Sequence, residues 1–182
     1  MADRQIVVVY DTKEGHTRSI AEHIAERVHA AGFEARVFEA SAPPVNLDGA
    51  AGVIVGGSIH VGKHGKHLVR FVKTYREQLE RTPAAFFSVS LAATRTDAEH
   101  QAEAARLVDE FEQATGWRPE LTACFAGALP YSKYNFLVRF VMRRISKKEG
   151  GDTDTSRDYV YTRWDEVDAF TDSLLGRVVA GT

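Results

Sequence analysis

Residues 6–17 read IVVVYDTKEGHT, an apolar run that passes through a short polar turn into a helical pattern. The run Ile6–Tyr10 is rich in β-branched residues and shows no polar alternation, which predicts a strand buried on both faces. Behind the turn, apolar residues recur every four positions from Ile20 to Val28, and Gly32 ends the helix. A buried strand that leads into an amphipathic helix favours an α/β fold.

The same alternation continues along the chain. Further strands are expected at 35–38, 53–55, 84–91 and 121–128, and further helical faces at 68–79, 104–111 and 167–178. Strands separated by helices run parallel, and right-handed crossovers place helices on both faces of the sheet. The sequence therefore predicts a doubly wound, five-stranded parallel sheet in a single domain spanning residues 1–182.

Two pairs of residues have the spacing of a capping box, in which two side chains satisfy the free N–H groups at a helix start. The pairs are Thr96 with Glu99 and Thr162 with Asp165. They predict that the third and the last helix begin at these positions.

Composition limits the classes of protein that need to be considered. The chain is 44% hydrophobic and 26% charged with a net charge of −2, which argues against a protein whose whole surface binds nucleic acid. No apolar run approaches the roughly 20 residues of a membrane-spanning helix, and the polar segment Met1–Gln5 carries no signal peptide. The one cysteine, Cys124, forms no intrachain disulfide and is expected in the core. We expect a cytoplasmic protein, peripheral at the inner face of the cell membrane.

Ligands of a doubly wound sheet bind beyond the carboxyl ends of its strands. The loop after the first strand contains Thr12, Lys13, Glu14, Gly15, His16 and Thr17. Threonine hydroxyls, a glycine that permits close approach and the unpaired amides of a helix start together predict a site for a phosphate monoester. The loop lacks both G-x-G-x-x-G and the Gly-Lys-Ser/Thr end of a P-loop, which disfavours a dinucleotide or a nucleoside triphosphate. An ordinary capped turn is the alternative.

Two further loops follow the third and fourth strands. In residues 56–62 (GGSIHVG), the paired glycines suggest backbone pressed against a flat ligand, beside Ser58, Ile59 and His60. Residues 88–94 (SVSLAAT) follow the fourth strand. Exposed backbone amides are expected there at Ser88, Ser90, Leu91 and Ala92. Each loop alone is also compatible with a plain turn. Three such loops, after the first, third and fourth strands, together favour one shared ligand.

Three histidines follow the third strand, at His60, His64 and His67. We expect them to form a polar surface cluster near a helix start. A zinc site is disfavoured because no cysteine or acidic ligand lies at a fitting spacing.

Residues 130–158 form an insertion that a minimal doubly wound domain does not need. Residues 131–148 contain no acidic residue and six basic ones: Lys133, Arg139, Arg143, Arg144, Lys147 and Lys148. As a helix, this segment would place Tyr134, Leu137, Val138, Val141 and Ile145 on one face, and Arg139, Arg143 and Lys147 on another. Such a helix is typical of contact with an anionic membrane, and it would equally cover a cleft for an acidic, apolar substrate. Packing against its own domain is the alternative. Nucleic acid is disfavoured because the excess of basic over acidic residues is confined to this segment.

Two sets of motifs resemble known families. The loop TKEGHT, residues 12–17, resembles the flavodoxin phosphate loop T/S-x-T-G-x-T, with Glu14 where that family usually has threonine. The stretches AGALPYSKY (126–134), GGDTDT (150–155) and VYTRWD (160–165) resemble the menaquinone-dependent protoporphyrinogen IX dehydrogenases of bacteria, which are flavodoxin-like FMN proteins. This resemblance extends from Ile6 to about Leu175.

The resemblance implies that one non-covalently bound FMN oxidises protoporphyrinogen IX to protoporphyrin IX and passes electrons to menaquinone or another quinone, in heme biosynthesis. It implies that Lys13 and residues 15–17 hold the FMN phosphate, and that residues 58–60 and 90–92 flank the flavin ring. The basic residues expected at the substrate propionates or at the membrane are Arg139, Arg143, Arg144 and Lys147. No catalytic acid–base pair and no metal ligand set is expected. An FMN-dependent NAD(P)H:quinone reductase and a flavodoxin-type electron carrier are the alternatives.

Overall fold

The structure is a computed structural model that describes residues 4–42, 44–148 and 150–181, so Met1 to Asp3 of the expected polar N-terminal segment lie outside it. Its five main strands are β1 (Gln5–Asp11), β2 (Glu34–Glu39), β3 (Gly52–His60), β5 (Ala84–Ser90) and β6 (Leu121–Ala126). They lie in the order β2-β1-β3-β5-β6, and every neighbouring pair is parallel. The prediction of a five-stranded parallel sheet is confirmed.

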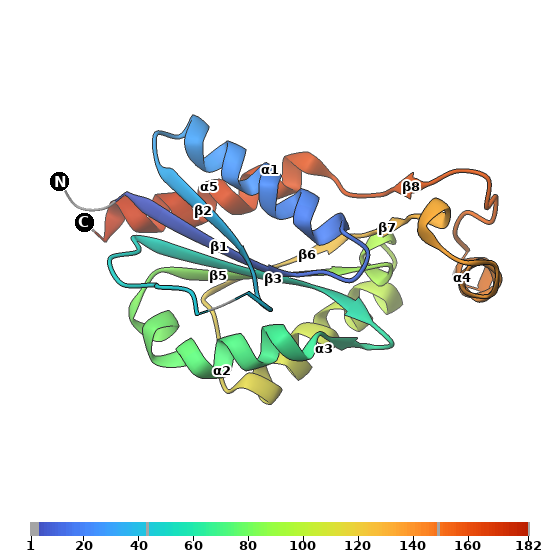
Figure 1. Cartoon of the computed structure of the whole chain (residues 1–182), viewed down its shortest axis with the longest axis horizontal. Helices are drawn as coiled ribbons and strands as arrows, with labels where there is room; N and C mark the ends of the chain where they lie inside the picture. The colour runs from blue at the N-terminus through green and yellow to red at the C-terminus, as the bar shows by residue number, and fades with distance from the viewer. Residues whose placement is uncertain (1–3, 43, 149, 182) are drawn as a thin grey trace.

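Two helices cover each face of this sheet. They are α1 (His16–Ala30) and α5 (Trp164–Ala180) on one face, and α2 (Lys66–Arg81) and α3 (Ala98–Thr115) on the other (Figure 1). The side chains of β1 alternate between the two cores: Val8 packs towards α1 and α5, whereas Val7 and Val9 pack towards α2 and α3. Both sets are fully buried, which explains why the strand reads as one unbroken apolar run. Cys124 is half-buried beside the second core.

Strand β3 is longer than the sequence predicted. It continues through His60, turns at Val61 and Gly62, and returns as the short antiparallel strand β4 (Lys63–His64). Both turn residues have positive φ, 49° and 72°, as a tight two-residue hairpin requires. The prediction that residues 56–60 form a loop is therefore wrong, although the turn itself lies at 61–62.

The paired glycines of β3 make room for neighbouring core side chains. A Cβ atom added to Gly56 would lie 1.9 Å from the Phe87 ring, and one added to Gly57 would lie 2.4 Å from Leu68 Cδ2. Phe87 belongs to the core on the α1 side and Leu68 to the core on the α2 side. The two glycines are thus explained by packing within the protein, on both faces of the sheet, rather than by a flat ligand.

Both predicted capping boxes are wrong. Helix α3 begins at Ala98, because the carboxylate of Asp97 accepts the His100 amide N–H at 3.2 Å. Helix α5 begins at Trp164, and the hydroxyl of Thr162 donates instead to the carbonyl oxygen of Ala126 at 2.7 Å. Thr162 therefore ties the start of α5 to the end of β6.

Between β6 and α5 the chain leaves the main sheet. Strand β7 (Ala128–Leu129) pairs with β8 (Tyr159–Val160), and between them lie the short helix η2 (Tyr131–Lys133) and the helix α4 (Phe136–Lys148). The short helix η1 (Ala92–Thr94) follows β5. Figure 1 shows α4 at one end of the molecule, beyond the carboxyl ends of the main strands. Within the described ranges, every helix is too short or too polar to cross a bilayer.

Replacing Gly56 with alanine should lower the free energy of unfolding by about 3 kcal/mol, because the new methyl group overlaps the buried Phe87 ring. Gly176→Ala is a matched control, since Gly176 lies in α5 and an added Cβ would meet nothing beyond the backbone of its own helix. This control should raise the free energy of unfolding by about 0.5–1 kcal/mol through helix propensity. Urea denaturation measures both, and a shift of the same sign in the two variants would contradict the packing explanation.

Candidate functional site

The loop after β1 has the features of an anion site. Gly15 is the N-cap of α1 with φ 93°, and its amide N–H donates to Thr12 Oγ1 at 3.0 Å. The first amides of α1 have no acceptor inside the helix. Thr17 is 1% exposed, and its hydroxyl has no hydrogen-bond partner among the described residues. Because a buried hydroxyl without a partner is unfavourable, this group indicates a polar ligand, and the loop fits the phosphate of FMN.

The carboxyl ends of the strands bring the predicted loops together. The register pairs Asp11 with Gly57, and Gly57 with Ser88. At the edge of the sheet, Lys13 Nζ lies 2.5 Å from His60 Nε2, which joins the loop after β1 to the tip of the β3–β4 hairpin. Both side chains are exposed, so they are accessible to a ligand at this edge.

His16 points towards β6 and α5. Its Nε2 atom lies 2.6 Å from the Thr162 hydroxyl, which itself donates to the Ala126 carbonyl. The Thr162 oxygen must therefore accept, so Nε2 of His16 carries the proton. Burial, together with the nearby charge of Lys133, lowers the pKa of His16 and so favours the neutral form of the ring. His16 is left with its backbone amide, rather than its side chain, for a phosphate at the start of α1.

The segment after β5 is only partly available to a ligand. Ser88 is 2% exposed and hydrogen-bonds with His64 Nε2 at 3.0 Å, so its side chain lies in the core. Ser90 is also buried, and its hydroxyl accepts the Ala93 amide at 3.3 Å. Leu91 and Ala92 are half-buried, at the point where the chain turns into η1. The structure thus brings Leu91 and Ala92 to the edge of the sheet and places Ser88 inside.

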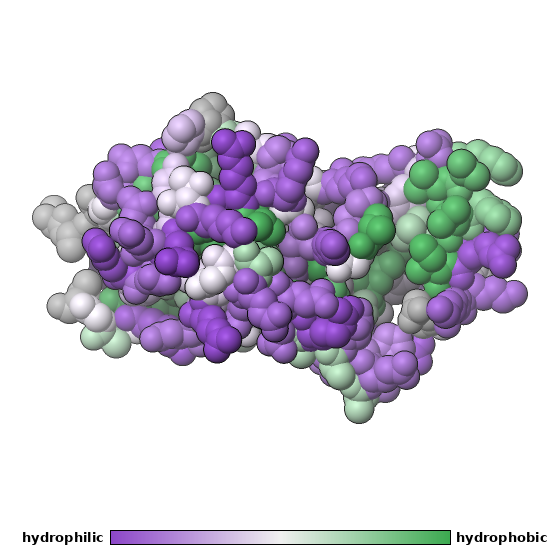
Figure 2. All heavy atoms as spheres, turned by 90° about the horizontal axis from the view of Figure 1, so that it is seen from below, coloured by the Kyte–Doolittle hydropathy of each residue, from purple (hydrophilic) through white to green (hydrophobic). Residues whose placement is uncertain are grey.

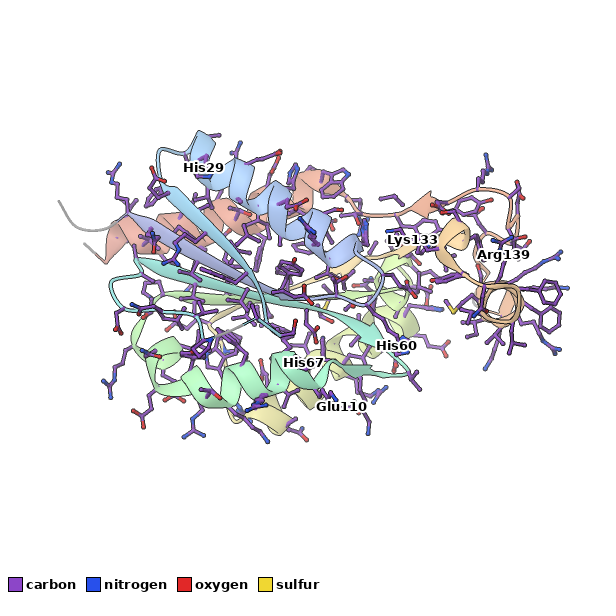
Figure 3. The ribbon with its side chains drawn as sticks, viewed as in Figure 1. His29, His60, His67, Glu110, Lys133 and Arg139 are labelled. Atoms are coloured by element: carbon purple, nitrogen blue, oxygen red, sulfur yellow. The ribbon has the colours of Figure 1, made fainter. Side chains whose placement is uncertain are left out.

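The expected surface cluster of three histidines does not form. His60 and His67, both labelled in Figure 3, are exposed, but His64 packs against Phe86 and Phe111 with ring centroids 5.4 and 4.9 Å away. Burial lowers the pKa of His64 to about 4. Among the described residues, no group of three histidine, cysteine or acidic side chains is placed to hold a metal ion.

Three residues at this edge are not among the site residues that the sequence predicts. Asp11 is half-buried at the end of β1, and burial raises its pKa although the Leu68 amide acts in the opposite direction. A polar residue directly after a buried strand is a signal that could have identified it. The other two are Lys133 and Tyr134, which contact Glu14. Lys133 Nζ donates to the Glu14 carbonyl at 2.8 Å, and the Tyr134 hydroxyl donates to the Glu14 carboxylate at 2.9 Å.

The basic residues of α4 are divided between two environments. Arg139 is half-buried and donates to the Tyr134 carbonyl at 3.2 Å, while its Nε has no partner in the described part of the chain. Arg143, Arg144 and Lys147 are exposed. Together with Phe140 and Lys148 they line an open groove.

The apolar side chains of α4 face outward. Phe136 is 86% exposed and Leu137 is 70% exposed, and Figure 2 shows hydrophobic side chains gathered at the α4 end of the molecule. Tyr134 does not share their face, because it lies before α4 in extended conformation and is buried beside Tyr131. The prediction that Tyr134 belongs to the helical face is wrong. Helix α4 instead turns Met142 and Ser146 towards the rest of the molecule.

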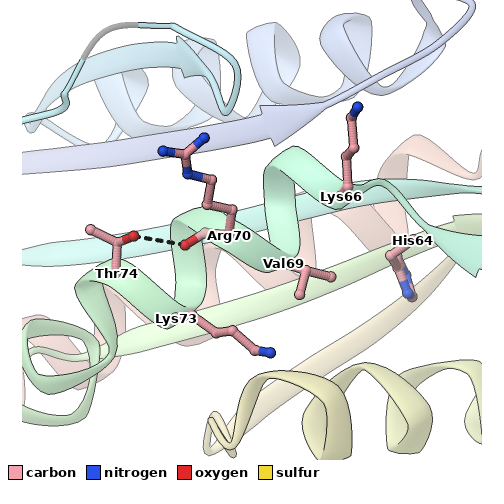
Figure 4. A pocket seen from close by; sticks show the side chains of 6 residues that line it. All are labelled: His64, Lys66, Val69, Arg70, Lys73 and Thr74. Carbon is pink, nitrogen blue, oxygen red and sulfur yellow. Dashed lines mark hydrogen bonds between the residues drawn. The ribbon is translucent and has the colours of Figure 1, made fainter.

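A second groove follows helix α2, and Figure 4 shows the side chains that line it. They are His64, Lys66, Val69, Arg70, Lys73 and Thr74. None of them belongs to the three predicted loops. The hydroxyl of Thr74 donates to the Arg70 carbonyl at 2.9 Å, a bond within the helix itself. We therefore do not assign this groove to the candidate site.

Comparison with known proteins defines the class. The family model for the flavodoxin domain matches residues 7–156. Among solved structures, a short-chain flavodoxin associated with a non-canonical PDU bacterial microcompartment aligns with a TM-score of 0.56, at 12% identity over 96% of this chain and 98% of that one. A flavodoxin of Streptococcus pneumoniae TIGR4 aligns with a TM-score of 0.53, at 14% identity over 95% and 99%. This is a flavodoxin-like protein, and the prediction of FMN as cofactor is confirmed.

Two curated relatives define the family within that class. The protoporphyrinogen IX dehydrogenase [quinone] of Escherichia coli K12 is 33% identical over 168 residues, covering 90% of this chain and 91% of the relative. The protein of the same name from Leishmania major is 34% identical over 167 residues, covering 90% and 71%. The chain belongs to the protoporphyrinogen IX dehydrogenase [quinone] family, and the resemblance found in the sequence is confirmed.

The low pKa of His64 predicts a pH dependence of stability. An unfolded histidine titrates near 6.5, so between about pH 6.5 and 4 the unfolded chain binds a proton that the folded chain does not. The free energy of unfolding should therefore fall by about 3 kcal/mol as the pH drops through this range. His64→Gln should lack this component. Urea denaturation at stepped pH measures the difference, and parallel pH profiles for the two proteins would contradict it.

Proposed function

We propose that this chain oxidises protoporphyrinogen IX to protoporphyrin IX, with FMN as cofactor and menaquinone or another quinone as electron acceptor, in heme biosynthesis. The observation that carries the proposal is the position of the basic insertion. Its residues Lys133 and Tyr134 contact Glu14 in the loop that fits the FMN phosphate. The family relatives supply the reaction, and the insertion that contacts the cofactor loop also carries the basic surface for an acidic substrate.

The chain itself binds and orients the reactants. Bound FMN would supply the two-electron redox chemistry between the porphyrinogen and the quinone. The amides of residues 16 and 17, the Thr17 hydroxyl and Lys13 would hold its phosphate, with Gly15 allowing the close approach. Ser58–His60 and Leu91–Ala92 would border its ring, with Ser90 behind them in support. Ser88 would act only indirectly, because its side chain is bonded to His64 in the core.

Helix α4 offers the contacts that the substrate requires. A porphyrinogen is a large apolar ring that carries two propionates. In the groove of α4, the exposed Arg143, Arg144 and Lys147 lie beside the ring of Phe140. Guanidinium groups form strong charge-assisted hydrogen bonds with carboxylates. The unpartnered Nε of Arg139 is a further donor at the base of α4.

We also propose that α4 contacts an anionic membrane surface, which places the protein in the cytoplasm, peripheral at the inner face of the cell membrane. The exposed Phe136 and Leu137 adjoin the basic side chains on one short helix. This combination is typical of a helix that lies in the headgroup region, and a quinone acceptor is reached from there. On this proposal the chain is one domain, 1–182, with the insertion at about 130–158 serving both partners.

Reversing the charge of Arg143 and Arg144 should reduce the rate of porphyrin formation by about tenfold or more, because the propionates lose their partners. The assay follows porphyrin fluorescence from anaerobically prepared protoporphyrinogen IX, with and without a menaquinone analogue. Arg70→Glu with Lys73→Glu on α2 makes the same change of net charge and should leave the rate near that of the wild type. No quinone-dependent rate in the FMN-loaded wild type would refute the proposed reaction, and NADPH oxidation with a soluble quinone would then point to a quinone reductase.

Replacing Phe136, Leu137 and Phe140 with serine should weaken binding to phosphatidylglycerol vesicles by about tenfold or more, since buried apolar area contributes most of such binding. Val179→Ser is the control, because Val179 is an exposed apolar residue on α5. Co-sedimentation measures the bound fraction. Equal binding of all three proteins, or binding unaffected by lipid charge, would exclude α4 as the contact.

A further inference from the structure

The insertion places a positive charge on the cofactor loop. Lys133 Nζ donates to the Glu14 carbonyl at 2.8 Å, and a Cβ atom added to Gly15 would lie 3.3 Å from the same nitrogen. The ammonium group therefore contacts the turn at the start of α1. A lysine ammonium has three N–H donors, so it can keep the bond to Glu14 and still donate to an anion.

Glu14 in the same loop carries a negative charge, which would repel a bound phosphate if it lay close to it. The Glu14 carboxylate accepts the hydroxyl of Tyr134 at 2.9 Å. Tyr134 is held in place by its edge-to-face contact with Tyr131, whose own hydroxyl donates to the Asp152 carbonyl at 2.8 Å. All of these partners except Glu14 belong to the insertion. The carboxylate is thus directed towards the insertion by a buried tyrosine pair.

Three kinds of donor lie at the start of α1: the free amides of the first turn, the buried Thr17 hydroxyl without a partner, and the Lys133 ammonium. We propose that Lys133 is a ligand of the FMN phosphate, and that Tyr134 is a positioning residue that holds the Glu14 carboxylate away from it. This inference rests on the proposed function, in that it takes FMN as the cofactor. It means that the phosphate site is completed by a segment more than a hundred residues away in the sequence.

A consequence is that FMN and the insertion stabilise each other. A phosphate that contacts Lys133 links the start of α1 to η2, at the base of α4. A bound FMN should then hold the insertion in the position seen in this structure. In that position its surface is available to the substrate and the membrane. Riboflavin has the same ring but no phosphate, so it should lack this effect.

The first test is titration of the full-length apo-protein with FMN and with riboflavin, followed by flavin fluorescence. Lys133→Met should weaken FMN binding by about tenfold and leave riboflavin binding unchanged, because only the phosphate contact is lost. Lys133→Arg should restore most of the FMN affinity. Tyr134→Phe should also weaken FMN selectively. Lys148→Met removes the same charge at the far end of α4 and should bind both flavins as the wild type does.

Equal losses for FMN and riboflavin, or unchanged FMN binding in Lys133→Met, would overturn the inference while leaving the proposed function intact. Failure of the wild type to bind FMN would overturn both. A second measurement uses the wild type alone, so it does not depend on a variant that folds. FMN should slow chymotryptic cleavage at the exposed Phe136 and Phe140, whereas riboflavin should not. Equal protection by the two flavins would contradict the proposed role of the phosphate.

Discussion

The parallel pairing of β1 with β3 determines where every functional group of this protein lies. Because the strands all run in one direction, their carboxyl ends meet at one edge, and the register aligns Asp11, Gly57 and Ser88 there. The start of α1, the tip of the β3–β4 hairpin and the turn into η1 follow directly from those ends. The insertion leaves the sheet from the same edge, after β6. The insertion therefore begins at the same edge as the cofactor loop, and its Lys133 and Tyr134 contact Glu14 in that loop.

Two half-buried histidines connect this edge to the interior. His64 bonds to Ser88 between two phenylalanine rings, and His16 donates to Thr162, which in turn bonds to the end of β6. Burial lowers the pKa of both rings and so favours the neutral, hydrogen-bonding form of each. Thr162 has particular importance because one hydroxyl joins the start of α1, the end of β6 and the start of α5. The position of the cofactor loop is therefore set by the core rather than by the loop itself.

The sheet and its helices were predictable because the spacing of apolar residues along the sequence indicates which side chains are buried. The unbroken apolar run of β1 and the four-residue spacing in α1 each have one structural explanation. Period-two alternation would also have placed Ser88 beside Phe86, on the α2 side and away from a ligand. Other features depend on contacts that no local pattern encodes. The pairing of Lys133 with Glu14 spans 119 residues, and the glycines of β3 are explained only by Phe87 and Leu68. Tyr134 was assigned to a helical face because its spacing fits, whereas the chain is extended at this residue.

The antiparallel pair of β7 and β8 joins the two ends of the insertion. Backbone pairing of Ala128 with Val160 and of Leu129 with Tyr159 brings the two ends of the insertion side by side. The segment can therefore change in length and sequence without displacing β6 or α5, since its connection to the sheet has a fixed span. Such an arrangement lets selection vary the surface that meets other molecules while the sheet stays the same. A single ancestral scaffold could in this way acquire new substrates through one exchangeable segment, which makes the pair of β7 and β8 the natural boundary for grafting insertions between relatives.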